Sequence, residues 1–207
     1  MHPNPSFRKT SRETNLAFAR KRGFGVLSIN GVDVPLSAHI PFLLSQDGTK
    51  IQGHLARSNP ILRALKEKDD ATQALLTISG PDAYISPDWY GVQDQVPTWN
   101  YVAVNLQGRL KALPAEDLLP HLSKLSAFFE ARLLPKPPWL TDKVAPEALS
   151  RMLRMIVPVE MTVSSVDATW KLAQNKGDAA RLAAAEGLQA SGEEFAELAE
   201  LMKKPPA

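Results

Sequence analysis

Hydrophobic positions near the start of the chain follow a helical period and then change to a strand-like run. A hydroxyl at Thr10 and a carboxylate at Glu13 have capping-box spacing, which predicts a helix over the residues that follow. Gly23 is the expected end of this helix, because glycine commonly follows a helix C-terminus. The apolar run 23–29 then predicts a strand, and the Asn-Gly pair at 30–31 predicts a hairpin turn after it.

Five more segments have the alternation or the short apolar run of a β-strand. They cover residues 32–44, 50–56, 71–79, 100–113 and 155–166. Pro35 and Pro41 predict that the first of these is an edge strand or a bulged one, since proline cannot donate to a neighbouring strand. Gly108 predicts a bulge or bend in the fourth. Strands joined by tight turns favour an antiparallel barrel or sandwich over repeated βαβ units.

Helical segments lie between and after these strands. They cover residues 60–68, 114–133, 147–153, 178–189 and 191–204. The Asn-Pro pair at 59–60 is the expected start of the first helix, and Pro120 should break or restart the second in its first turns. Asp178 is the expected N-cap of the fourth helix. Ser191 and Glu194 form a capping box for the fifth.

The composition is that of an ordinary globular protein and excludes some chemistry. The 207 residues are 44% hydrophobic and 22% charged, so the chain can bury a sizeable core. We interpret residues 1–207 as a single domain with a C-terminal helical extension over about 178–204. The absence of cysteine excludes disulfides, thiol catalysis and Cys-based metal sites. Neither a membrane-spanning run nor a signal-peptide core occurs, and we expect a cytoplasmic protein.

Charge gives little support to a nucleic-acid partner. The formal net charge is only +2, and the basic residues within 8–22 are interpreted as a solvated helix face. The nearest match to a helix-turn-helix is the terminal helix pair. Its second helix begins with Glu193 and Glu194, which would repel phosphates where a recognition helix should meet base edges. DNA binding is therefore possible, but no recognisable motif supports it.

Residues 80–101 combine aromatic rings with prolines. Five of the fourteen Phe, Trp and Tyr residues of the chain fall here, namely Tyr84, Trp89, Tyr90, Trp99 and Tyr101. Such rings could close one end of a barrel as core, form a dimer interface, or flank a flat ring ligand. Their clustering in an apparent connector between strands favours an interface or a pocket.

The stretch GHLARSNP (53–60) places anion-binding groups where a strand ends and a helix begins. Backbone N–H groups at a helix start favour an anion, and Arg57 adds a charged forked donor. Ser58 adds a hydroxyl and Asn59 an amide. The stretch is either a phosphate cradle or an ordinary capped helix with a surface arginine, and the residues alone do not decide between these interpretations.

Two other groups of polar residues could bind a ligand, but each can also be explained without one. His39 and His54 could meet across neighbouring strands, but no spacing typical of a metal site is present, and we expect no metal. Lys171, Gln174, Asn175 and Lys176 form a polar, partly basic group after the last strand, which by itself indicates a solvated loop. The motifs of serine hydrolases and of Rossmann dinucleotide sites are absent.

Five segments taken together resemble the PaiB family of FMN-binding negative transcriptional regulators. They are HIPF (39–42), GHLARSNP (53–60), GPDAYISPDWY (80–90), VPTWNY (96–101) and KLAQNKGD (171–178), in this order and spacing. The resemblance covers almost the whole chain. It implies a six-stranded FMN-binding split barrel with flanking helices, related to the pyridoxamine-phosphate-oxidase-like flavoproteins. It also implies a homodimer with flavin in the groove between subunits.

The resemblance also implies where the cofactor lies. The FMN phosphate would be held by residues 57–59, the flavin would lie beside strand 32–44, and 171–175 would reach it from the partner chain. The residues implied at the cofactor are His39, Ile40, Pro41, His54, Arg57, Ser58, Asn59, Trp99, Lys171, Gln174 and Asn175. The aromatic rings implied at the subunit interface are Tyr84, Trp89, Trp99 and Tyr101.

Three functional hypotheses follow from these observations. The first is a homodimeric flavin-binding protein that responds to redox state or to a ligand and affects transcription. The second is a flavin-dependent oxidoreductase or a haem-handling enzyme of the split-barrel class. The third is a DNA-binding repressor with a vestigial flavin groove. The second hypothesis differs from the first in predicting catalytic turnover, that is, oxidation of a reduced nicotinamide or another donor faster than by free FMN. The third hypothesis differs from both in predicting salt-dependent DNA binding.

Overall fold

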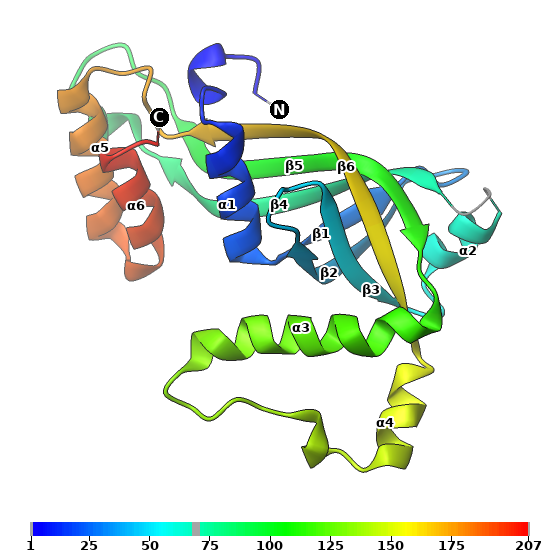
Figure 1. Cartoon of the computed structure of the whole chain (residues 1–207). Helices are drawn as coiled ribbons and strands as arrows, with labels where there is room; N and C mark the ends of the chain where they lie inside the picture. The colour runs from blue at the N-terminus through cyan, green and yellow to red at the C-terminus, as the bar shows by residue number, and fades with distance from the viewer. Residues whose placement is uncertain (1, 68–70, 207) are drawn as a thin grey trace. The chain divides into compact units, whose positions relative to one another are not determined.

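The strands form a closed antiparallel barrel in the computed structural model, which describes residues 2–67 and 71–206 (Figure 1). The strands are β1 (Phe24–Ile29), β2 (Leu36–Leu44), β3 (Lys50–Ala56), β4 (Thr72–Ile85), β5 (Thr98–Ala112) and β6 (Ile156–Lys171). Their order around the barrel is β1-β2-β3-β6-β5-β4. The predicted six-stranded barrel in an α+β protein is confirmed.

The helices flank and follow these strands. They are α1 (Arg12–Arg22), α2 (Pro60–Lys66), α3 (Leu118–Glu130), α4 (Pro146–Leu153), α5 (Asp178–Ser191) and α6 (Ala196–Lys203), with a short 3-10 turn, η2 (Pro87–Tyr90), after β4. The predicted end of the helical segment 60–68, at residue 68, lies outside the described residues. None of the helices in the described part of the chain is long and apolar enough to cross a membrane.

The chain divides into two compact units. The barrel unit comprises residues 19–77 and 106–165, and the helical unit comprises 1–18, 78–105 and 166–207. The long strands β4, β5 and β6 each have one part in the barrel unit and the other part in the helical unit. The single domain expected for 1–207 stays a prediction.

The core of the barrel unit is built from strand residues that alternate inward. In β1, Leu27 and Ile29 are buried, and Leu27 lies opposite Leu76 of β4. Inward residues of all six strands surround a void of only about 10 Å³. The residues around this void are Leu27, Ile40, Ile51, Gly53, Leu76, Leu110, Val159 and Met161. The interior is therefore packed protein, and a ligand must bind elsewhere.

The expectation of an edge strand at 32–44 is wrong, because β2 pairs on both sides. Residues 36–41 pair with β1, and residues 42–44 pair with β3. Pro41 lies where the pairing passes from one neighbour to the other, so its missing N–H costs little. At the predicted bend in β5, a Cβ on Gly108 would lie 2.0 Å from the carbonyl oxygen of Thr162, which explains the glycine.

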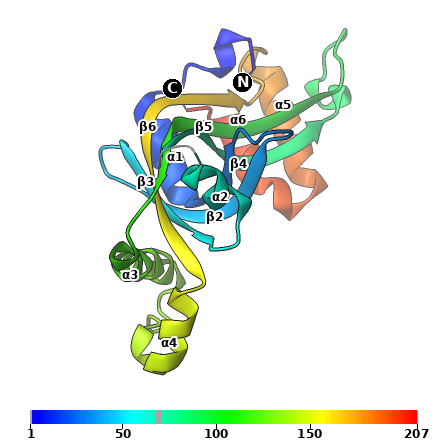
Figure 2. The same cartoon turned by 90° about the vertical axis from the view of Figure 1, so that its right-hand side faces the viewer.

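Local signals located the starts of α1, α2, α4 and α5 to within a residue or two, whereas α3 and α6 begin at Leu118 and Ala196 and not at the predicted residues 114 and 191. Asn59 is the N-cap of α2, and Pro120 is the third residue of α3, where no N–H is needed. At α1 the cap is Ser11 rather than Thr10, since Ser11 Oγ accepts the N–H of Thr14 at 3.1 Å. Figure 2 shows α2 lying across one end of the barrel strands.

Two predicted caps in the terminal helix pair are wrong. Gly177, not Asp178, is the N-cap of α5, and Asp178 is the first residue within the helix. Ser191 is the last residue of α5 and donates its hydroxyl to the Leu188 carbonyl at 2.6 Å, so it does not cap the next helix. Arg181 of α5 donates to carbonyls at the C-terminal end of α6 at 2.5 and 2.7 Å, which ties the pair together.

Candidate functional site

The start of α2 has the predicted cap, and its arginine has a role that the sequence did not show. Asn59 Oδ1 accepts the N–H of Ile61 at 2.9 Å. Arg57 donates through Nε to the carbonyl of Arg154 at 2.6 Å and through a terminal nitrogen to that of Ile156 at 3.4 Å. These bonds use two of the five guanidinium N–H groups and orient the other three. Ser58 is exposed.

Two adjoining cavities lie against α3 and α4 in the barrel unit. The first, of about 480 Å³, has mostly aliphatic walls with Arg57, Ser150 and Arg154 as its polar groups. The second, of about 360 Å³, is almost entirely apolar and is lined by Pro41, Phe129 and Trp139 among others. Leu119 and Leu149 line both cavities, which together we call the α3–α4 groove. It has a cationic end and an aromatic end.

The residues of HIPF are divided between core, surface and groove. His39 is exposed and its ring stacks at 6.3 Å from that of Phe24. The side chain of Ile40 is buried in the barrel core, which leaves only its backbone to meet a ligand. Pro41 lines the aromatic end of the α3–α4 groove. The structure therefore brings Pro41 and Arg57, two of the predicted cofactor residues, to the same groove.

His54 meets a histidine that sequence reasoning missed. Its Nδ1 lies 3.3 Å from Nε2 of His121, which projects from α3 and is only 3% exposed. Burial lowers the pKa of both histidines, and the neighbouring charges of His54 and Lys124 help to lower that of His121 to about 4. The Nδ1 atom of His121 is buried without a hydrogen-bond partner. The pair is neutral at pH 7 and joins α3 to β3.

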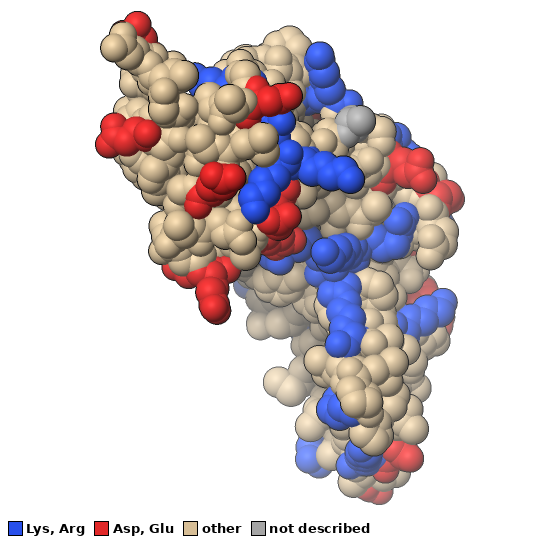
Figure 3. Space-filling model, turned by 90° about the vertical axis from the view of Figure 1, so that its left-hand side faces the viewer, with Lys and Arg blue, Asp and Glu red and all other residues tan. Residues whose placement is uncertain are grey.

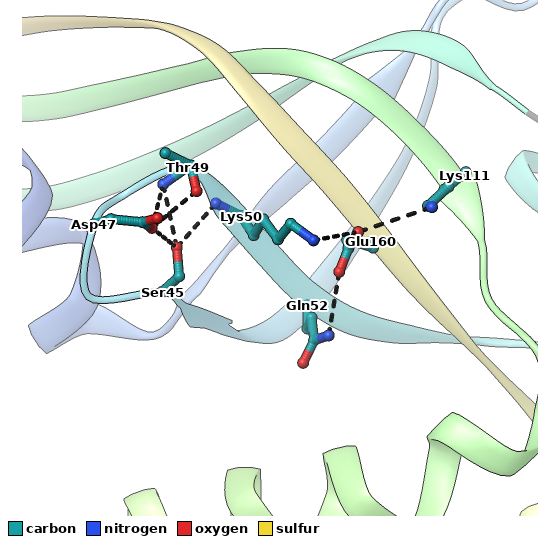
Figure 4. Close-up of polar contacts among 7 residues, drawn as sticks. All are labelled: Ser45, Asp47, Thr49, Lys50, Gln52, Lys111 and Glu160. Atoms are coloured by element: carbon teal, nitrogen blue, oxygen red, sulfur yellow. Dashed lines mark hydrogen bonds and ion pairs between the residues drawn. The ribbon is translucent and has the colours of Figure 1, made fainter.

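A buried carboxylate, Glu160, lies in the wall of the barrel (Figure 4). Glu160 of β6 is held by Lys50 at 3.6 Å and Lys111 at 4.0 Å, and Gln52 donates to it at 3.2 Å. These four side chains come from three neighbouring strands, and the two ammonium groups neutralise the carboxylate within the barrel wall. Within the described residues, no three His, Cys, Asp or Glu side chains group as metal ligands would.

The loop after β6 is rigidly held in the helical unit. Trp170 is buried and donates to Asn15 at 2.7 Å. Ala173 has a left-handed φ of 63°, which is unfavourable for a residue other than glycine. Gln174 stabilises this turn by accepting the N–H of Leu172 at 2.7 Å and donating to the Trp170 carbonyl at 2.5 Å. Its amide is thus used within the loop, while Asn175 is exposed.

Two lysines flank this loop, and the charge of Lys176 acts on Lys171. Lys171 is hydrogen-bonded to the hydroxyl of Thr98, and Lys176 to the side-chain oxygen of Gln95. The ammonium of Lys176 also lies 5.2 Å from the centre of the Tyr90 ring. Burial, and secondly the charge of Lys176, lower the pKa of Lys171. Lys176 belongs to the polar group noted in the sequence, but its contact with Tyr90 could not be predicted, because the two residues lie far apart in the chain.

The aromatic stretch is strand at both ends and connector between them, because β4 continues to residue 85 and β5 begins at 98. Tyr84 and Trp99 remain about half exposed, with their rings 6.4 Å apart, and Trp99 donates to Asp82 at 3.0 Å. Trp89 packs instead on Gly187 of α5, where a Cβ would approach its ring to 2.6 Å. The rings therefore have two roles: internal packing and an exposed aromatic pair.

Comparison with known proteins agrees with this architecture. The family described as "Putative FMN-binding domain" matches residues 1–165. The "Protease synthase and sporulation protein PAI 2" of Bacillus subtilis (strain 168) is 32% identical over 200 residues, which cover 95% of this chain and 94% of the relative.

Solved structures share the fold at low identity. A FAD and heme binding protein of Mycobacterium smegmatis has a TM-score of 0.56 at 15% identity, over 79% of this chain and 73% of that one. The flavocytochrome Anf3 of Azotobacter vinelandii has a TM-score of 0.57 at 14% identity, over 82% of this chain and 72% of that one. These likenesses show the fold alone.

The barrel and these matches define the class as the FMN-binding split-barrel flavoproteins. Within that class, the chain belongs to the PaiB family, and its cofactor is a flavin, FMN.

Proposed function

We propose that this protein is a homodimeric FMN-binding regulator of the PaiB type, and that its FMN lies in the α3–α4 groove. The observation that most supports this placement is the different lining of the two ends of the groove. One end carries the positive charge of Arg57, and the other end is apolar and aromatic, with Pro41 and Trp139 in its wall. FMN has the matching form, with a phosphate at one end and a flat isoalloxazine ring at the other.

The size and lining of the groove suit such a ligand. Small-molecule sites are typically ~300–1,000 Å³, mostly apolar, with a few polar groups that fix orientation. The phosphate is placed at Arg57, whose guanidinium is oriented by two carbonyls and keeps three free N–H groups, and at Ser58 and Asn59. The isoalloxazine ring is placed beside Pro41 and near the backbone of Ile40. In this proposal His39 of β2 and His54 of β3 lie at the adjacent positions of the two strands.

The second subunit completes the site in this proposal. Trp99, Lys171, Gln174 and Asn175 reach the flavin from the other copy of the chain, with Gln174 acting by holding its loop in shape. The exposed pair Tyr84 and Trp99 supports an interface, because two half-exposed aromatic rings side by side are costly in water.

Regulation of transcription is supported by the family and by the Bacillus subtilis relative, whose name refers to protease synthesis and sporulation. The terminal helix pair does not support direct DNA reading. Leu198, Ala199 and Met202 of α6 are fully buried, and its exposed side includes acidic residues. The face drawn in Figure 3 carries both basic and acidic side chains. We therefore propose that flavin state or a ligand alters a partner contact, in a protein that we expect in the cytoplasm.

The test is retention of FMN after gel filtration, followed by its visible absorption near ~450 nm. We expect the purified protein to retain flavin and Arg57→Ala to lose most of it. Arg63→Ala removes the same charge from an exposed position on α2 and should retain flavin like the original protein. A colourless protein after incubation with FMN would refute the proposal. Oxidation of a reduced nicotinamide faster than by free FMN would favour the oxidoreductase hypothesis.

A further inference from the structure

Lys171 and Lys176 form a cationic pair whose charges the protein does not neutralise. Both are half-buried, and among the described residues neither has a carboxylate within 4.0 Å. Their hydrogen bonds go instead to the neutral side chains of Thr98 and Gln95. Cations that are partly withdrawn from water are normally paired, so an uncompensated pair points to an anion from outside the chain.

A third group at this place also has no partner. Tyr90, whose ring lies under the Lys176 ammonium, is 2% exposed, and its hydroxyl is buried without a hydrogen bond. Burial raises the pKa of Tyr90, so the phenol stays protonated and can donate. A buried hydroxyl without an acceptor is costly, and a ligand oxygen would satisfy it.

The backbone holds these groups in place. The left-handed conformation of Ala173 is unfavourable, and the two hydrogen bonds of Gln174 keep it in that shape between the lysines. An open cavity of about 410 Å³ lies beside the site and has Gln95 in its wall. Asp88 and Asp94 also line this cavity, and their carboxylates would repel an anion. We therefore place the anion at the end of the cavity formed by Gln95, to which Lys176 is hydrogen-bonded.

The geometry points to an oxyanion site formed by Lys171, Lys176 and Tyr90, which takes a phosphate or diphosphate group. Two ammonium groups and a phenol offer several N–H and O–H donors, which suits an oxygen-rich dianion better than a single carboxylate. The group could belong to FMN or to a second phosphorylated ligand. The inference itself does not rest on FMN in the α3–α4 groove.

The experiment measures the Kd of inorganic pyrophosphate by calorimetry on the full chain at low salt. We expect Lys171→Gln and Lys176→Gln each to weaken binding by about tenfold, the usual size of a lost charge-assisted contact. Lys176→Arg should recover most of the affinity, and Tyr90→Phe should weaken binding severalfold. Binding should also weaken as salt rises.

The matched control is Lys203→Gln, which removes a lysine of the same unit that already pairs with Glu200 at 2.7 Å. It should leave the Kd of pyrophosphate unchanged. Equal affinity in all of these proteins, or no binding at millimolar pyrophosphate, would overturn the inference. Thermal melting of each variant verifies that the comparison is between folded proteins.

Flavin titrations identify the source of the phosphate. If Lys176→Gln weakens FMN but not riboflavin, the site holds the FMN phosphate. If it weakens pyrophosphate but leaves FMN unchanged, the site holds a second ligand. Arg57→Ala separates this inference from the groove proposal, because loss of FMN in that variant with unchanged pyrophosphate binding supports both sites independently.

Discussion

The histidine pair between α3 and β3 makes the stability of the protein depend on pH in a calculable way. His121 is 3% exposed, with a pKa of about 4 in the folded chain against an ordinary value of 6.5. A histidine whose pKa is lowered by folding binds protons more readily when unfolded. The contribution of His121 to the free energy of unfolding is therefore fully present above pH 6.5 and is lost as the pH falls toward 4.

The size of the effect follows from these two values. Between pH 7 and pH 5, the shift of His121 from 6.5 to about 4 corresponds to a loss of about 2 kcal/mol in the free energy of unfolding. The pKa of His54 is lowered in the same direction and adds to the loss. Lys124 is the other charge that acts on His121, and its effect has the same sign.

The perturbation is His121→Leu, which keeps the volume and removes the titrating group. The free energy of unfolding of this variant at pH 7 should be within about 1 kcal/mol of that of the original protein. The substitution removes the hydrogen bond to His54, which destabilises the fold, and it also removes the buried Nδ1 atom that has no partner, which offsets this loss. Urea unfolding at pH 7 and pH 5 gives both free energies. The difference between the two pH values should shrink by about 2 kcal/mol in the variant.

The control is His39→Leu, which makes the same substitution at an exposed position of β2. Acid sensitivity of His121→Leu equal to that of the original protein would refute the reasoning. The carboxylates of the chain contribute equally to both proteins and cancel in the comparison.

Three further results are expected. Arg57→Ala should weaken FMN binding by about 1.5–3 kcal/mol, measured by flavin fluorescence titration, and an unchanged Kd would remove residues 57–59 from the site. Light scattering should return about twice the 22.7 kDa of one chain at micromolar concentration, and a mass near 22.7 kDa would rule out the dimer. Gly108→Val should lower the free energy of unfolding by more than about 3 kcal/mol, because its Cβ would meet the Thr162 carbonyl, and a melting temperature unchanged from the original would contradict this.

Local features of the fold could be predicted because their causes lie within a few residues. Asn59 and Pro60 fix the start of α2, and Pro120 fits only the first turn of α3. Where two neighbouring residues could serve as the cap, the sequence did not distinguish Thr10 from Ser11. Strand lengths were underestimated for β4 and β6, because pairing in a closed barrel extends strands beyond their apolar runs.

The site could be predicted only in part, because its contacts join residues far apart in the chain. Arg57 was identified from its place before a helix, but its carbonyl partners lie 97 and 99 residues away. His121 is 67 residues from His54 and sits in a helix with an otherwise apolar face. Lys176 and Tyr90 lie in two stretches that were noted in the sequence, but the contact between them is formed only by the fold.

The central claim, that FMN lies in the α3–α4 groove, is tested most directly by filling the groove. Leu122 lines its apolar end and is partly exposed, so Leu122→Trp should fold while it occupies the place of the isoalloxazine ring. Leu133→Trp, at an exposed leucine outside the lining, is the control. We predict that FMN titration gives a Kd weakened at least about tenfold for Leu122→Trp and unchanged for Leu133→Trp. Equal FMN affinity in the two variants would place the flavin elsewhere.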